Sequence, residues 1–138
     1  DETDSCNFFL YKYPISNEIK KRILFMNDNI KNYSKDYFYS KKNLLKLSYY
    51  NGKSMAIDFM ILLIFIDSKK ISKIQNLIEF IQEFQMPKFP INATFLKEVF
   101  YFVDGKELGN ALKKLEEYWI NNNFKIEKEN IKKILNIK

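Results

Sequence analysis

The stretch GKELGNALKKLEEYWI, residues 105–120, decides the fold class of this chain. Its apolar positions recur at the spacing of an α-helix, and we expect one buried face made of Leu108, Ala111, Leu112, Leu115 and Trp119. Asp104 is expected to cap this helix, with Glu107 at the third helical position as in a capping box. Three consecutive asparagines, residues 121–123, are expected to end it, since Asn tolerates the left-handed conformation. The stretch therefore predicts a long amphipathic helix.

A boundary lies just upstream of this helix. Pro87 and Pro90 stand three residues apart in QMPKFPIN, residues 85–92, and such a pair is incompatible with a continuous helix. We expect a helical body-like subdomain over residues 1–86 and a tail-like helical subdomain over residues 87–138. Asn92 is expected to cap a short helix that ends near Tyr101.

The rest of the chain also shows helical periodicity. Ser16 is a good cap for a helix whose apolar stripe is expected to be Ile19, Ile23, Met26 and Ile30. Further helices are expected over residues 41–50, 55–66, 71–84 and 127–135, whereas residues 1–15 and 32–40 are expected to be irregular. The chain has 138 residues with three Gly and three Pro, too few turn residues for a many-stranded fold. The sequence thus predicts an all-α protein of about six to seven helices.

Residues 55–66 form the most apolar segment, with Asp58 as its only charge. Its length of about 12 residues falls short of the roughly 20 that span a bilayer, so we expect no membrane partner. The segment is expected to be a helix buried on most sides; a buried strand is the alternative.

Cysteine and histidine usage excludes several chemistries. With one Cys and no His, the chain has no internal disulfide, no His- or Cys-based zinc site and no His-based catalysis. No phosphate-binding loop or metal-ligand spacing is visible. We expect no metal site and no catalysis by this segment alone.

The formal charge of +6 suggests a polyanionic partner such as nucleic acid. Basic residues are concentrated in two zones, residues 16–53 and 106–138. The candidate RNA-binding residues are Lys20, Lys21, Arg22, Lys106, Lys113, Lys114, Lys125, Lys128, Lys132 and Lys133. The alternative is an ordinary solvated lysine-rich face, because an AT-rich coding sequence also enriches Lys, Asn and Ile.

A family resemblance emerges from residues 86–124. The motif elements are Pro87-x-Phe89-Pro90-Ile91, then Leu96, then Gly105-x-x-Leu108-Gly109-x-x-Leu112-x-x-Leu115-x-x-x-Trp119. This pattern resembles the C-terminal signature of bacterial-type CCA-adding enzymes (tRNA nucleotidyltransferases) and poly(A) polymerases. The chain departs from the family by having Ala93, Phe95 and Phe100 where the family has Gly, Asp and Gly.

The resemblance implies the RNA-holding helical region of such an enzyme, with the tRNA elbow as partner. It implies that nucleotidyl transfer with Mg²⁺ and CTP or ATP belongs to an N-terminal head that is not in this chain. An intracellular location, cytoplasmic or organellar, follows from the same resemblance. Since the first residue is Asp1, we expect a processed piece or a segment of a longer chain.

Plain structural roles accompany the motif. Pro87 and Pro90 are expected to stiffen a turn, and Trp119 is expected in the core. Gly105 and Gly109 are expected to allow close backbone approach, either to a phosphate near Lys106 or to a tightly packed helix.

A second hypothesis is a diverged, non-catalytic relative that acts as a structural or interaction subunit of a larger assembly. Phe100, Tyr101 and Phe102 would then face a partner, because three adjacent aromatic residues are difficult to bury in one core.

Overall fold

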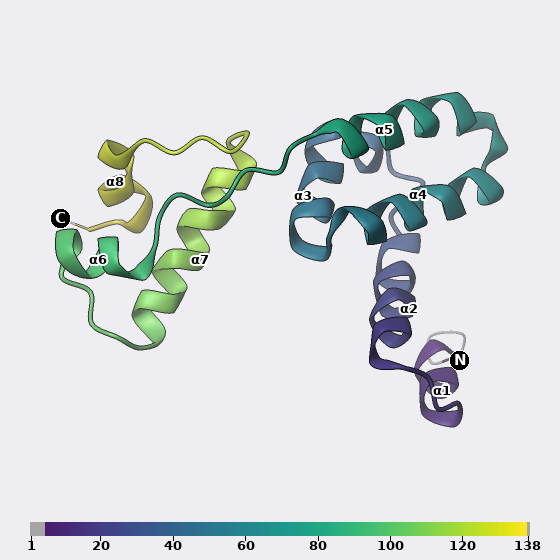
Figure 1. The fold of residues 1–138 in the computed structure, drawn as a ribbon, viewed down its shortest axis with the longest axis horizontal. Helices are drawn as coiled ribbons and strands as arrows, with labels where there is room; N and C mark the ends of the chain where they lie inside the picture. The colour runs from purple at the N-terminus through teal and green to yellow at the C-terminus, as the bar shows by residue number, and fades with distance from the viewer. Residues whose placement is uncertain (1–4, 138) are drawn as a thin grey trace. The chain divides into compact units, whose positions relative to one another are not determined.

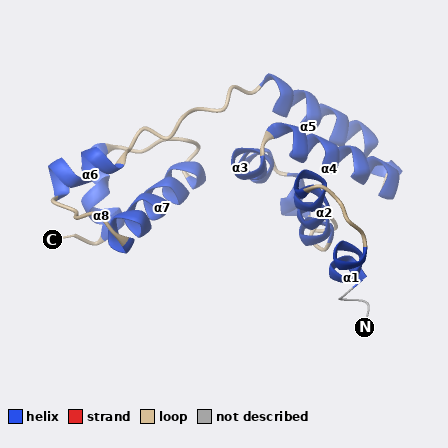
Figure 2. Cartoon of the chain, turned by 60° about the horizontal axis from the view of Figure 1, so that its bottom comes forward, coloured by secondary structure: helices blue, strands red, loops and turns tan. Residues whose placement is uncertain are grey.

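The computed structural model describes residues 5–137, and within them all side chains except that of Asp36. In this range every regular element is helical, with eight α-helices and three short 3-10 helices (Figures 1 and 2). The expected all-α class is confirmed. The chain divides into two compact units, which we call unit 1 (up to Phe84) and unit 2 (from Gln85).

Unit 1 is built around a helical hairpin. Its elements are α1 (Ser5–Lys12), α2 (Asn17–Ile30), η1 (Asp36–Tyr39), α3 (Lys41–Asn51), α4 (Lys53–Ile66), η2 (Ser68–Lys70) and α5 (Ile71–Glu83). Helices α4 and α5 lie side by side, and α3 packs against both (Figure 1). Helix α1 falls in a segment that was expected to be irregular. None of its residues is buried, so its sequence has no apolar stripe from which the helix could be predicted.

Local capping explains where several of these helices begin and end. The Ser16 hydroxyl accepts a hydrogen bond from the Ile19 N–H at 3.4 Å, as expected for the start of α2. Gly52 separates α3 from α4 with φ of 87°, a conformation that favours glycine. The Asp67 carboxylate accepts from the Lys69 N–H at 3.3 Å and so begins η2.

Aromatic rings form the centre of the unit 1 core. The Phe59 ring meets those of Phe25 and Phe38 edge to face, at centroid distances of 5.8 and 5.6 Å. Around them lie the buried side chains of Tyr39, Leu44, Met60, Leu63, Ile74, Leu77 and Ile81. The stripe expected for α2 is partly wrong, because Phe25 is its buried residue while Ile19 is 50% exposed. The free energy gained on burial increases with the apolar area of the side chain, so α2 is oriented with the large Phe25 ring toward the core.

The apolar helix α4 differs from expectation. We expected it to be buried on most sides, but several of its apolar side chains are exposed. Ala56, Phe59, Met60 and Leu63 are buried, whereas Ile61 and Ile66 are exposed and Phe65 is 82% exposed. The described helices include none that is both long and apolar enough to cross a membrane.

Unit 2 is a smaller helical assembly around one long helix. Its elements are α6 (Ala93–Phe100), α7 (Lys106–Asn121), η3 (Lys128–Asn130) and α8 (Ile131–Leu135). Both α6 and α8 contact α7. The core consists of Ile91, Leu96, Leu108, Ala111, Leu115 and Ile131. Trp119 is 2% exposed, as expected, and its ring lies 5.4 Å from Phe89 and 4.9 Å from Phe124.

The start of α7 differs from the expected capping box. Gly105 is the cap residue, with φ of 147° and no side-chain hydrogen bond. The Asp104 carboxylate instead accepts two hydrogen bonds from the Lys97 ammonium, at 2.8 and 3.1 Å. Asp104 thus links the end of α6 to the connection rather than capping α7.

The three consecutive aromatics after α6 do not share one environment. Phe100 and Phe102 are partly buried against the unit 2 core. Tyr101 lies between them with φ of 58° and is 86% exposed. Two of the three side chains expected to face a partner therefore pack within unit 2.

Candidate nucleic-acid interface

Helix α7 presents lysines on the surface that its buried stripe leaves free: Lys106 and Lys113 lie opposite the stripe, and Lys114 lies on its flank. Leu108, Ala111 and Leu115 are buried, and this orientation leaves Lys106, Lys113 and Lys114 exposed. Lys106 and Lys113 are seven residues apart, so they lie on nearly the same line along the helix. The amphipathic pattern read from the sequence thus determines which way these ammonium groups face.

Helix α8 adds a second pair of lysines to unit 2. Ile131 is fully buried against the core, and the next two residues, Lys132 and Lys133, are exposed. Because α8 contacts α7, burial of this one isoleucine brings basic side chains of the two helices to the same part of unit 2.

A groove of about 600 Å³ lies between α7 and the η3–α8 segment. Its lining residues are Lys114, Glu117, Tyr118, Asn121, Asn130, Lys133 and Ile134. Lys114 and Lys133 come from different helices and bring positive charge to it. Within residues 5–137, the side chains of Lys114, Glu117, Tyr118, Asn121 and Lys133 have no hydrogen-bond or ion-pair partner. The groove is therefore lined by polar groups that are available to a ligand.

The two lysines of the α7–α8 connection have different surroundings. Lys125 is exposed, and its carbonyl accepts a hydrogen bond from the Asn122 amide at 3.0 Å. The Lys128 ammonium lies 5.3 Å from the centre of the Phe95 ring, a cation–π contact. The Phe95 ring therefore holds the Lys128 ammonium close to the surface of α6.

The glycines of the motif do not act by close packing within the described chain. A Cβ added at Gly105 or Gly109 would meet no atom within 4 Å. Gly105 is required by its φ of 147°. Gly109 is exposed in the first half of α7, where no tightly packed helix accounts for it. The expected role in tight helix packing is wrong for both residues.

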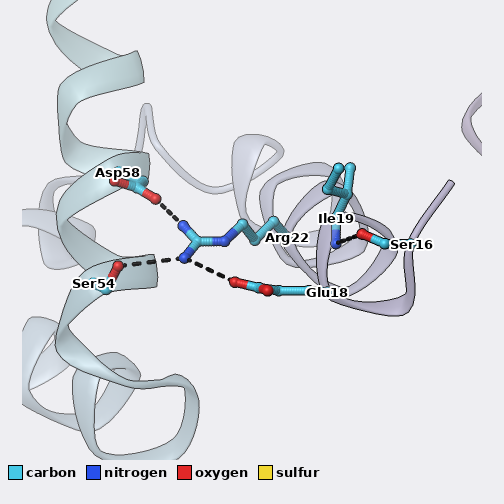
Figure 3. A network of polar contacts seen from close by, with 6 residues as sticks. All are labelled: Ser16, Glu18, Ile19, Arg22, Ser54 and Asp58. Carbon is cyan, nitrogen blue, oxygen red and sulfur yellow. Dashed lines mark hydrogen bonds and ion pairs between the residues drawn. The ribbon is translucent and has the colours of Figure 1, made fainter.

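The basic residues of α2 belong to unit 1. Lys20 and Lys21 are exposed, and Lys21 lines a second groove of about 520 Å³ together with Asp28 and Tyr50. Arg22 is part of a polar network (Figure 3). Its guanidinium donates to Asp58, lies 3.4 Å from the Ser54 hydroxyl and 3.6 Å from the Glu18 carboxylate. The donors of Arg22 are therefore used within unit 1.

Several groove residues were not among the sequence-derived candidates. Glu117, Tyr118 and Asn121 follow Lys114 at i+3, i+4 and i+7, so a helical projection of α7 would have placed them on its face. No comparable signal connects Asn130 or Lys133 to α7, because their proximity depends on how α8 packs.

A metal ion would need a cluster of side chains that could hold it. In residues 5–137 no three His, Cys, Asp or Glu side chains lie close enough together to form a metal site.

Comparisons of the chain with protein-family models, with curated proteins and with solved structures found no match.

Proposed function

We propose that this chain is an RNA-holding segment of the CCA-adding enzyme class and that unit 2 binds tRNA phosphates through lysines of α7 and α8. One observation carries the proposal. Lys113 and Lys114 of α7, and Lys132 and Lys133 of α8, are exposed and have no ion-pair partner within residues 5–137. The likeness of residues 87–119 to that family's C-terminal signature supports the same class.

Lysine side chains suit this role because an ammonium contacts phosphate oxygens without reading sequence. A folded RNA such as the tRNA elbow is recognised through its shape and backbone, which lysines on two helices of one unit can follow. Nucleotidyl transfer, with Mg²⁺ and CTP or ATP, belongs in this proposal to a separate catalytic head.

The test is tRNA binding by the full chain as a function of salt concentration, measured by fluorescence anisotropy. We expect affinity to fall steeply with salt, by a log–log slope of a little under one for each phosphate contacted. Reversing the charge of Lys113 and Lys114 to Glu should weaken binding at least roughly tenfold and reduce the slope by about two.

A matched control is the pair Lys42→Glu and Lys69→Glu, which makes the same charge change at exposed lysines of unit 1. We expect this pair to have a smaller effect than the pair in α7. Equal losses from the two pairs would indicate non-specific attraction to a basic protein. Unchanged affinity after the α7 reversal would contradict the proposal.

A second candidate function is a structural or interaction subunit. It is favoured by exposed apolar side chains in the C-terminal half of α4, where Ile61, Phe65 and Ile66 face solvent. Sedimentation of the wild type and of Phe65→Ser would test its simplest form. A concentration-dependent association that the substitution removes would support a protein interface there, and a monomer at all concentrations would contradict self-association.

A further inference from the structure

The geometry points to a second level of recognition within the proposed RNA-binding function. We propose that the groove between α7 and the η3–α8 segment holds one unstacked RNA base, stacked on Tyr118 and read by Glu117. This inference rests on the proposed function and adds the class of nucleotide that unit 2 would select: bases that present amino or imino donors.

The size and position of the groove fit one nucleotide. Its volume of about 600 Å³ lies within the range of about 300–1,000 Å³ of small-molecule sites. Lys114 and Lys133 can neutralise the phosphates on either side of an inserted base. Single-stranded loops and bulges of RNA supply such bases, because they can be turned out of the stack.

Tyr118 provides the stacking surface. It is 38% exposed and makes no ring contact with another aromatic residue of the described chain. The neighbouring Trp119 is buried between Phe89 and Phe124 and carries the packing of this turn of α7. The Tyr118 ring is therefore not needed for the core, and aromatic faces are the usual platforms for unpaired bases.

Glu117 argues against a simple phosphate site. A carboxylate in the same groove as Lys114 and Lys133 repels a phosphate placed there and equally disfavours an acidic peptide. A carboxylate is an acceptor-only group, so it requires a donor from the ligand. Base edges supply such donors, as in the pairing of Glu with the cytosine amino group.

The donor pattern of the four bases then predicts an order of preference. Guanine presents two adjacent donors, N1–H and the N2 amino group, which a carboxylate can accept together. Cytosine and adenine each present one amino group. Uracil presents a single N3–H between two carbonyl oxygens, which a carboxylate repels. The Asn121 amide offers both a donor and an acceptor and fits any of these edges. We expect guanine to bind best and uracil worst.

The experiment uses the full chain and a ten-nucleotide oligo(U) in which the central base is U, C, A or G. Binding is measured by fluorescence anisotropy at one fixed salt concentration. We expect the G-containing oligomer to bind several-fold more tightly than oligo(U). Tyr118→Ala should weaken its binding roughly tenfold, the size of a lost base–aromatic stack, whereas Tyr118→Phe should retain the affinity.

Glu117→Gln is the test of base reading. We expect it to remove most of the preference for G and to strengthen binding of oligo(U), because a negative charge is lost near phosphates. Tyr101→Ala is the matched control, since Tyr101 is an exposed tyrosine of unit 2 that does not line the groove. Circular dichroism of each variant shows whether it is folded.

The outcomes separate this inference from the function on which it rests. If Tyr118→Ala and Glu117→Gln bind every oligomer as the wild type does while tRNA binding stays salt-dependent, the base-holding groove is overturned and phosphate binding stands. If the wild type shows no salt-dependent binding of tRNA and binds none of the oligomers, both proposals are overturned. A wild type that binds all four oligomers equally also overturns the base-reading role of Glu117.

Discussion

Arg22 of α2 donates a hydrogen bond to Asp58 of α4, a residue 36 positions further along the chain (Figure 3). Arg22 is the single arginine, and Asp58 is the single charge in the apolar segment 55–66. The pair thus joins two helices of unit 1 that also meet through the rings of Phe25 and Phe59. It explains why a charged residue interrupts the most apolar stretch of the sequence.

Replacing Arg22 with Ala should lower the free energy of unfolding by about 1–2 kcal/mol, because a charge-assisted contact is lost at a partly buried site. Arg22→Lys should restore part of this loss, since an ammonium lacks the planar fork that serves several acceptors. Urea denaturation followed by far-UV circular dichroism measures the change, with Lys20→Ala as the exposed control. A double-mutant cycle with Asp58→Ala that gives no coupling would refute the assignment.

Tyr39 has an unusual environment for its hydroxyl. Its side chain is 3% exposed, and within the described part of the chain the hydroxyl has no hydrogen-bond partner. The ammonium groups of Lys70 and Lys73 lie 4.5 and 5.4 Å from the ring centre. Burial, with smaller contributions from Asp67 and Tyr33, raises the pKa of Tyr39 above its ordinary value of 10.0.

Tyr39→Phe should therefore leave stability at pH 7 unchanged or raise it by about 1 kcal/mol, because an unsatisfied hydroxyl is removed. Since the folded-state pKa exceeds the unfolded-state value, the wild type loses stability as pH rises above about 10. The advantage of the variant should grow in that range. Thermal unfolding at pH 7, 9 and 10.5 measures it, with the exposed Tyr37→Phe as control. A variant less stable than the wild type at every pH would show that the hydroxyl has a partner.

The two motif glycines should respond to alanine in opposite directions. Gly109→Ala should raise the stability of unit 2 by about 1 kcal/mol, because it lies in a helix with open space beside it. Gly105→Ala should lower it by about 1–2 kcal/mol, because φ of 147° is strained for any side chain. Fluorescence of Trp119, the only tryptophan of the chain, reports unfolding of this unit.

The same pair also bears on binding. If Gly109→Ala stabilises unit 2 but weakens tRNA binding, the glycine serves close approach of the RNA backbone to α7. If the affinity for tRNA is unchanged, the expectation that Gly109 allows close approach of a phosphate is wrong.

Tyr101→Gly should stabilise unit 2 by about 1 kcal/mol. Tyr101 ends α6 in the left-handed conformation, with φ of 58° and ψ of 30°, and glycine adopts this conformation without strain. Its side chain is largely exposed, so little packing is lost. Val103→Gly is the control, because Val103 is similarly exposed but is not among the residues with positive φ. A gain from both substitutions, or from neither, would contradict the conformational explanation.

Much of the fold of unit 2 could be read from the sequence. The expected cap Asn92 accepts a hydrogen bond from the Phe95 N–H at 2.8 Å. Helix α7 ends within the expected asparagine run, where Asn123 has φ of 55°. Trp119 lies in the core as expected. These features could be predicted because caps, turns and apolar periodicity depend on residues that are close together in the sequence.

Other features could not be read in this way. The helix α1 buries nothing and so lacks a periodic signal. The expected stripe of α2 did not contain Phe25, whose burial depends on its contact with Phe59 of α4, although Met26 and Ile30 of that stripe do pack against the core. The N-cap of α7 is Gly105 and not the expected Asp104, because the Asp104 carboxylate accepts a hydrogen bond from Lys97 of the preceding helix.

The sequence by itself determined that the chain is helical, where most helices begin and end, and which side of α7 carries lysines. Tertiary structure alone decided that Arg22 meets Asp58 and that Lys114 and Lys133 line one groove. The physical reason is the separation along the chain over which each kind of interaction acts. Capping and amphipathicity are local properties of the chain, whereas a contact between distant residues depends on how whole helices pack.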